Sequence, residues 1–122
     1  PSVSATTPPE ARSSMALANL LTGIPTALPE ELVDVLADTA GVRIERIVSR
    51  GHSSPPGFWY EQAEHEWVLI LRGRARLGFD HGAPEVELGE GDHLLIPAGR
   101  RHRVSWTDPE VETIWVAVFF AR

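Results

Sequence analysis

The chain has 122 residues, of which 43% are hydrophobic and 23% are charged, with a formal net charge of −6 and no cysteine. This length is typical of one domain with a single core. The lack of cysteine excludes disulfides and thiol chemistry, and the negative charge argues against a nucleic-acid or anionic-membrane partner. No apolar run approaches the roughly 20 residues of a membrane-spanning helix, so we expect a cytoplasmic protein.

Two segments precede the part of the chain with strand patterns. Residues 1–14 are rich in Ser, Thr, Pro and Ala without an apolar period, which predicts a flexible tail. Residues 15–41 are expected to form an N-terminal helical arm, with a short helix over residues 29–41. Proline and acids in its first turn and a glycine at its end favour this helix. Its apolar stripe consists of Leu32, Val33, Val35 and Leu36.

The rest of the chain, residues 42–122, has the pattern of an all-β domain. Short apolar segments alternate with turn signals at intervals of about ten residues, which is typical of a sandwich or barrel. Asp80-His81-Gly82 is a clear hairpin signal. The expected strands are residues 42–49, 57–62, 66–72, 74–80, 85–88, 93–97, 102–107 and 112–120.

Two of these strands bear on possible partners. Arginine occurs at every second position from Arg72 to Arg76, and Glu85 and Glu87 on the next strand can lie opposite. A solvated strand face is therefore favoured over a nucleic-acid site. The last strand is apolar on both faces, which predicts burial on both sides, and subunit association is one way to achieve it.

The most specific segment begins at Gly91 and ends at His102. It reads as a turn, a short apolar strand, a Pro-x-Gly turn and a histidine that opens the next strand. Gly91 and Gly99 allow positive φ at the two turns, and Pro97 ends strand pairing. This geometry directs His102 into the interior of a small β-barrel, where its imidazole can bind a metal.

The spacing G-x5-P-x-G-x2-H-x3 resembles the second sequence motif of the cupin superfamily, which usually closes with Asn where this chain has Trp106. The first cupin motif has the form G-x5-H-x-H-x3–4-E-x6-G, and Glu66 and Gly73 match its second half. The resemblance covers roughly residues 42–120. It implies a cupin-type double-stranded β-helix, a jelly-roll-like barrel, and a homodimer, because many cupins dimerise.

The first half of that motif departs from the cupin pattern. The four-residue spacer puts Trp59 and Glu61 at the two histidine positions, whereas the three-residue spacer puts Tyr60 and Gln62 there. We expect Trp59 and Glu61 to share the inward face with Glu66. A slip of one residue would send each side chain to the opposite face.

The resemblance also implies a metal centre, because cupins bind a divalent ion with imidazoles and a carboxylate. Here the ligands would be Glu66 and His102, with Glu61 in the shell and His52 as a possible fourth. One imidazole and two carboxylates can hold Fe, Mn, Zn or Ni. The alternative is a buried, hydrogen-bonded pair of Glu66 carboxylate and His102 imidazolium without a metal.

Aromatic residues are expected to shape the pocket. Trp59 and Trp106 would form a flat apolar wall beside Glu66 and His102, which suits a planar or aromatic small molecule. Tyr60 could offer its hydroxyl as a proton donor, which makes it a candidate catalytic residue with Glu66 and His102. Alternatively, these aromatic side chains fill the core and the subunit contact.

Cupins host oxygenases, isomerases, epimerases, lyases, sensors and storage proteins, so the fold does not define the activity. Our first hypothesis is a metal-dependent cupin that acts on a small organic molecule in oxygenase- or isomerase-type chemistry, with the metal polarising a ligand oxygen. The second is a non-catalytic module that binds or senses a small ligand without metal. The third is a barrel whose cavity is filled by Trp59 and Trp106, which leaves an interaction role.

Overall fold

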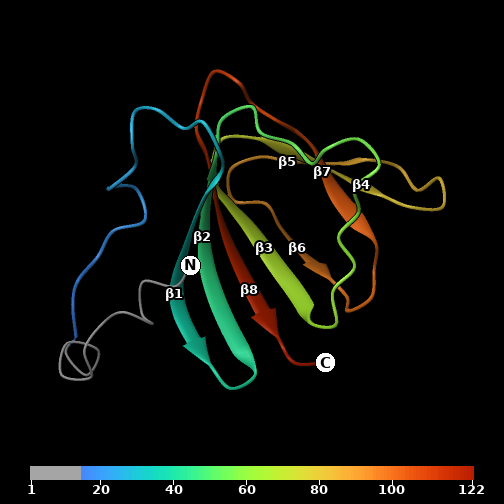
Figure 1. Cartoon of the computed structure of the whole chain (residues 1–122), viewed down its shortest axis with the longest axis horizontal. Coiled ribbons are helices and arrows are strands. Elements are labelled where there is room, and N and C mark those ends of the chain that lie inside the picture. The colour runs from blue at the N-terminus through green and yellow to red at the C-terminus, as the bar shows by residue number, and fades with distance from the viewer. Residues whose placement is uncertain (1–14) are drawn as a thin grey trace.

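The computed structural model describes residues 15–122, and the predicted tail over residues 1–14 lies outside this range. Eight strands form a five-stranded sheet, ordered β1-β2-β8-β3-β6, and a three-stranded sheet, ordered β5-β4-β7. Figure 1 shows the two sheets as separate layers. The predicted all-β architecture is confirmed. The strands are β1 (Leu32–Thr39), β2 (Val42–Ser49), β3 (His65–Arg72), β4 (Ala75–Phe79), β5 (Val86–Leu88), β6 (His93–Ile96), β7 (His102–Thr107) and β8 (Thr113–Phe120).

The predicted helix over residues 29–41 is wrong, because most of this segment forms strand β1. β1 pairs antiparallel with β2, with Asp34 opposite Arg46. The Arg46 guanidinium donates to the Asp34 carboxylate, with Nε 2.9 Å from Oδ2. The apolar spacing fits either structure locally, but the hairpin turn at Gly41 (φ +87°) brings β2 alongside. Cross-strand pairing then outweighs the weak local helix preference.

The predicted strand over residues 57–62 is reduced to a single bridge. Tyr60 pairs antiparallel with His102. The Tyr60 N–H donates to the His102 carbonyl at 2.7 Å, and the His102 N–H donates back to the Tyr60 carbonyl at 3.0 Å. The Gly99 N–H donates to the Gln62 carbonyl at 2.7 Å. These bonds hold the irregular loop before β3 against the start of β7.

The core lies between the two sheets, where alternate side chains of facing strands meet. Its members include Val68, Ile70, Leu77 and Trp115, all nearly inaccessible to solvent. Burying each aliphatic side chain of this size stabilises the fold by about 1.5–3 kcal/mol. This apolar layer encloses the polar groups described below.

The segment of residues 15–31 has no regular helix or strand but is tied to the barrel by side chains from β2 and the following loop. Arg46 Nη1 donates to the carbonyls of Leu20 at 3.1 Å and Thr22 at 2.6 Å. Arg50 Nη1 donates to the Thr26 carbonyl at 3.0 Å. The segment thereby leads the chain to the start of β1 (Figure 1). Among residues 15–122, no helix is long and apolar enough to cross a membrane.

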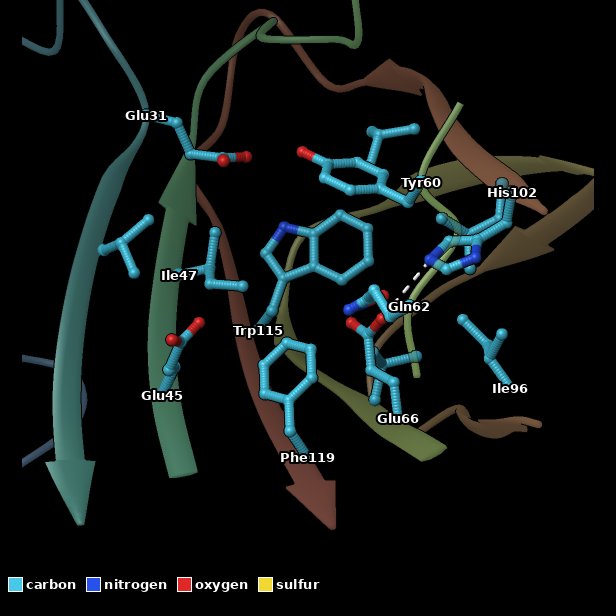
Figure 2. Close-up of a pocket in the computed structure, with 14 residues that line it drawn as sticks. Glu31, Glu45, Ile47, Tyr60, Gln62, Glu66, Ile96, His102, Trp115 and Phe119 are labelled. Carbon is cyan, nitrogen blue, oxygen red and sulfur yellow. Dashed lines mark ion pairs between the residues drawn. The ribbon is translucent and has the colours of Figure 1, made fainter. Parts of the chain in front are cut away.

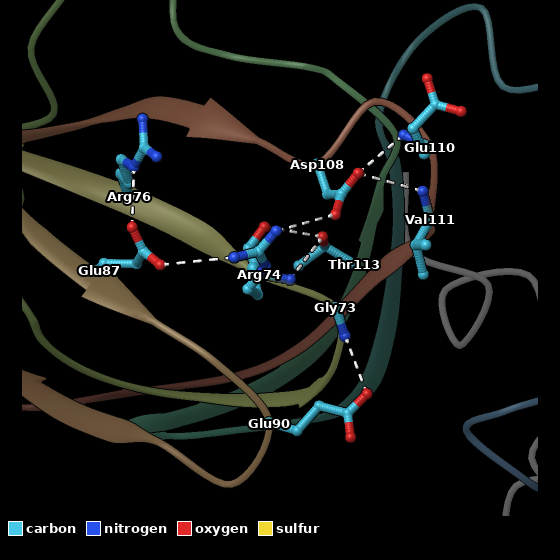
Figure 3. Close-up of polar contacts among 9 residues, drawn as sticks. All are labelled: Gly73, Arg74, Arg76, Glu87, Glu90, Asp108, Glu110, Val111 and Thr113. Carbon is cyan, nitrogen blue, oxygen red and sulfur yellow. Dashed lines mark hydrogen bonds and ion pairs between the residues drawn. The ribbon is translucent and has the colours of Figure 1, made fainter.

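The arginines of β4 and its preceding turn are accompanied by acidic side chains, as Figure 3 shows. Arg76 Nε lies 3.0 Å from Glu87 Oε1. Arg74 lies 3.8 Å from both Glu87 and Asp108. Exposed pairs of this kind contribute at most about 1 kcal/mol each. They do neutralise this strand face, as the cross-strand pattern predicted.

Candidate functional site

A cavity of about 150 Å³ lies between the two sheets, as Figure 2 shows. Strands from both sheets and two irregular segments contribute to its wall. The lining is mainly apolar, with three glutamates, one histidine, one tyrosine and one glutamine. It consists of Glu31, Val33, Glu45, Ile47, Tyr60, Gln62, Glu66, Val68, Leu77, Ile96, His102, Val104, Trp115 and Phe119.

Glu66 and His102 meet on this wall, as the two motifs predicted. Glu66 lies on β3 of the larger sheet, and His102 opens β7 of the smaller one. His102 Nε2 lies 3.2 Å from Glu66 Oε1, and the two side chains are only 6% and 12% exposed. His102 Nδ1 lies 2.9 Å from the Arg100 carbonyl oxygen. Both ring nitrogens of His102 therefore already have partners.

The protonation of His102 follows from these contacts. Burial lowers the pKa of its imidazole, but the hydrogen bond to Glu66, the Arg100 carbonyl and the Glu66 charge together raise the pKa above its ordinary value. The pair therefore favours carboxylate with imidazolium. Tyr60 stacks on this imidazole, with ring centroids 5.5 Å apart at 27°. Burial, followed by the charges of Glu31 and Glu66, raises the pKa of the Tyr60 hydroxyl, which stays protonated.

In the structure, the two positions given by the three-residue spacer of the first motif face the cavity. Tyr60 and Gln62 line the cavity together with Glu66, whereas Trp59 and Glu61 do not. The Glu61 side chain is 63% exposed and lies 3.7 Å from Arg101. The Arg101 guanidinium also lies over Trp59, with its Cζ 5.4 Å from the centroid of the Trp59 ring. A shift of one residue along the chain accounts for the whole difference.

Trp106 is also outside the cavity, for a different reason. Simple alternation from His102 and Val104 would turn Trp106 inward. However, β7 has a bulge where it pairs with β4. Arg76 pairs with Trp106 and the next residue, Leu77, pairs with Val104, so that Ser105 is an extra residue in β7. The extra residue reverses the alternation. Trp106 therefore lies on the outer face, with the Arg76 guanidinium 4.5 Å from its ring centroid.

His52 is held away from Glu66 and His102 by its own hydrogen bonds. Its Nδ1 accepts from the Arg50 N–H at 2.9 Å, so Nε2 carries the proton and donates to the Leu28 carbonyl at 3.1 Å. His52 therefore braces residues 15–31 and lines a second pocket, not the cavity.

Sequence reasoning missed several lining residues. Glu31 comes from the segment where a helix was predicted, and Glu45 lies on β2 beside Arg43, with Arg43 Nε 2.9 Å from Glu45 Oε2. Trp115 and Phe119 share one face of β8. Two-residue alternation along β8 could have identified these aromatic residues, whereas nothing in the local sequence marks Glu31.

Two polar atoms in the wall have no hydrogen-bond partner among the described residues. They are Gln62 Oε1 and Trp115 Nε1. Trp115 is only 4% exposed, so bulk water does not satisfy its indole N–H. Buried polar groups are normally bonded to protein, water or ligand. The cavity wall therefore offers one hydrogen-bond acceptor and one donor to a small molecule or a water.

The donor set does not fit a resident metal ion. Two positions that carry histidine in the cupin motif hold Tyr60 and Gln62, and the remaining imidazole is paired through both nitrogens. Within residues 15–122, no three or more His, Asp or Glu side chains are grouped so as to hold a metal.

Comparisons with known proteins define the family. The sequence model of the cupin domain matches residues 46–119. A candidate mannose-6-phosphate isomerase from Ralstonia eutropha JMP134 is 38% identical, with a TM-score of 0.85, and the alignment covers 88% of this chain and 100% of that chain.

Two further solved structures share the fold. A cupin superfamily protein from Desulfitobacterium hafniense DCB-2 is 22% identical, with a TM-score of 0.67 and coverage of 81% and 84% of the two chains. An RmlC-like cupin with a double-stranded β-helix from Methanocaldococcus jannaschii is 18% identical, with a TM-score of 0.63 and coverage of 80% and 86%. The curated proteins give no match. The chain belongs to the cupin domain family.

Proposed function

We propose that this cupin binds a small organic molecule in its central cavity without a metal ion. The observation that carries the proposal is the closed pairing of Glu66 with His102, whose ring nitrogens are both engaged. The pair acts as a fixed polar element of the wall, and Glu66 keeps its second oxygen as an acceptor. The unpartnered amide oxygen of Gln62 and the indole N–H of Trp115 can supply further polar contacts.

The cavity favours a ligand of about benzene size. An apolar cavity of 150 Å³ is large enough for a six-carbon ring. The name of the Ralstonia neighbour suggests a sugar phosphate, but mannose 6-phosphate is polar over its whole surface, unlike the mainly apolar lining of the cavity. Its phosphate would also face three carboxylates and a single imidazole. Anionic sugars are therefore disfavoured, and a compact apolar or aromatic ligand is favoured.

The expected metal content tests this proposal. Protein purified without an affinity tag or added metal is expected to contain far less than one Fe, Mn, Zn or Ni per chain. Its melting temperature should change by less than about 1 °C with EDTA or added divalent ions, because an ion that binds only the native state would raise it. Elemental analysis and thermal unfolding provide the two readouts.

Near-stoichiometric metal would instead support our first hypothesis from the sequence. In that case Glu66 and His102 would be ligands, and Glu61 or His52 would have to turn inward to complete the shell. Loss of that metal in His102→Ala would then assign the site and overturn metal-independent binding.

We also propose a homodimer that forms through the outer face of the five-stranded sheet. This face carries half-buried or exposed apolar side chains from three strands, among them Trp67, Phe120 and Leu95, of which Leu95 is 53% exposed. An open apolar sheet face of this kind is typical of subunit contacts.

Leu95→Glu should convert the protein to a monomer in light scattering coupled to size exclusion, because it would bury a charge in the contact. Val111→Glu is a control in the loop before β8, at a residue 46% exposed. A dimer that survives Leu95→Glu would place the contact elsewhere.

A further inference from the structure

A second pocket adjoins the cavity and shares part of its wall. It has a volume of about 250 Å³. Glu31, Tyr60 and Val104 line both spaces. The remaining lining of this outer pocket is Pro29, Glu30, His52, Ser53, Ser54 and Pro55. A ligand that extends from the cavity into the outer pocket therefore has to pass beside Glu31 and Tyr60.

The carboxylates of the cavity differ in how they are neutralised. Glu66 pairs with His102, and Glu45 pairs with Arg43. Glu31 accepts a hydrogen bond from the Ser49 hydroxyl at 2.9 Å but has no ion pair among the residues described. Its second carboxylate oxygen, Oε1, has no hydrogen-bond partner in the same range. Glu31 is thus the carboxylate in the wall that a cationic ligand group can neutralise.

Burial makes the ionised form of Glu31 less favourable, and a cationic ligand group would stabilise it. Desolvation raises the pKa of the Glu31 carboxyl, with a further increase from the Glu45 charge, while Ser49 and His52 act in the opposite direction. A nearby cation would offset the desolvation cost of the ionised form. In the outer pocket, Glu30 adds a second carboxylate and no Lys or Arg lines the wall.

Aromatic groups surround the same region. Figure 2 shows the Glu31 carboxylate and the Tyr60 hydroxyl turned toward each other, with the Trp115 indole nitrogen on the same side of the cavity. The Tyr60 hydroxyl oxygen can accept a hydrogen bond from a ligand ammonium. The buried N–H of Trp115, which has no partner, can donate to a water retained with the ligand inside the cavity.

From this geometry we propose that the ligand is a small arylalkylamine or alkylamine, whose apolar group fills the cavity and whose ammonium lies between Glu31 and Tyr60. The inference rests on the proposed function and adds the chemical class of the ligand. Benzylamine has the required form, because its ring matches a cavity of 150 Å³ and its aminomethyl group can reach toward the outer pocket.

Three probes of similar shape but different charge test the inference by isothermal titration calorimetry at neutral pH. Benzylamine is expected to bind at least about tenfold more tightly than benzyl alcohol, and benzoate is expected not to bind, because a charge-assisted hydrogen bond contributes more than a neutral one. Glu31→Gln should weaken benzylamine about tenfold and leave benzyl alcohol unchanged. Glu61→Gln, the same change on an exposed residue, should alter neither.

The outcomes separate this inference from the proposed function. If benzyl alcohol or benzoate binds as tightly as benzylamine, the amine assignment fails while small-molecule binding stands. If Glu31→Gln binds benzylamine like the wild type and unfolds at the same temperature, the ammonium is not held by Glu31 and the inference fails. If none of the three probes binds, both the amine assignment and the proposed pocket function are overturned.

Discussion

Glu66→Ala is expected to lower the free energy of unfolding by about 3 kcal/mol, because it leaves the buried His102 imidazole without its partner. The His102 residue is only 4% exposed, so its imidazole depends on the carboxylate rather than on bulk water. In contrast, the double variant Glu66→Leu with His102→Leu should unfold within about 1–2 kcal/mol of the wild type, since apolar residues can replace a buried ion pair. Urea unfolding followed by tryptophan fluorescence measures both values.

A surface pair provides the matched control for this experiment. Glu61 lies 3.7 Å from Arg101, and these side chains are 63% and 45% exposed. Glu61→Ala should therefore cost less than about 1 kcal/mol. If the double variant is no more stable than Glu66→Ala, the two side chains do not form the self-contained pair described above.

Gly73→Ala should lower the free energy of unfolding by about 3 kcal/mol or more, through backbone strain and steric overlap together. Gly73 has φ +89° at the turn after β3, and an added Cβ would lie 2.7 Å from the Glu112 carbonyl oxygen and 2.7 Å from Thr113 Cα. Both contacts are with backbone at the start of β8, which cannot move without disturbing the sheet. Figure 3 shows Gly73 close to Thr113.

Gly82→Ala separates strain from overlap. Gly82 also has positive φ, at +69°, but no atom lies within 4 Å of an added Cβ. This control should cost about 1 kcal/mol, the price of left-handed backbone alone. Equal losses in the two variants, measured by the same urea unfolding, would show that close approach of β8 does not explain the glycine at position 73.

The convergence of Glu66 and His102 could be predicted because local turn residues direct His102 inward and because the resemblance to the first cupin motif implies Glu66 on the facing wall. Gly91, Pro97 and Gly99 define the approach to His102, and these signals are local. Alternation along a strand then indicates which side chains point inward. The direction of His102 depends on short-range geometry, whereas its meeting with Glu66 across the two sheets was implied by the family resemblance.

The errors have non-local causes. β1 was predicted as a helix because its apolar spacing suits either structure, and only pairing with β2 decides between them. Trp106 was placed inside because a bulge in β7 cannot be recognised from alternation alone. Glu31 was missed because it reaches the cavity from a segment that is held in place by Arg46, Arg50 and His52. Such contacts exist only in the folded chain.

The most direct test of the central claim is a crystal structure of untagged protein with anomalous diffraction recorded at the Fe, Mn, Zn and Ni edges. We predict no anomalous peak beside His102 Nε2. We also predict a direct contact between that nitrogen and Glu66 Oε1, at about the present distance of 3.2 Å. An anomalous peak between the two side chains, with Glu66 and His102 both turned to it, would contradict metal-independent binding.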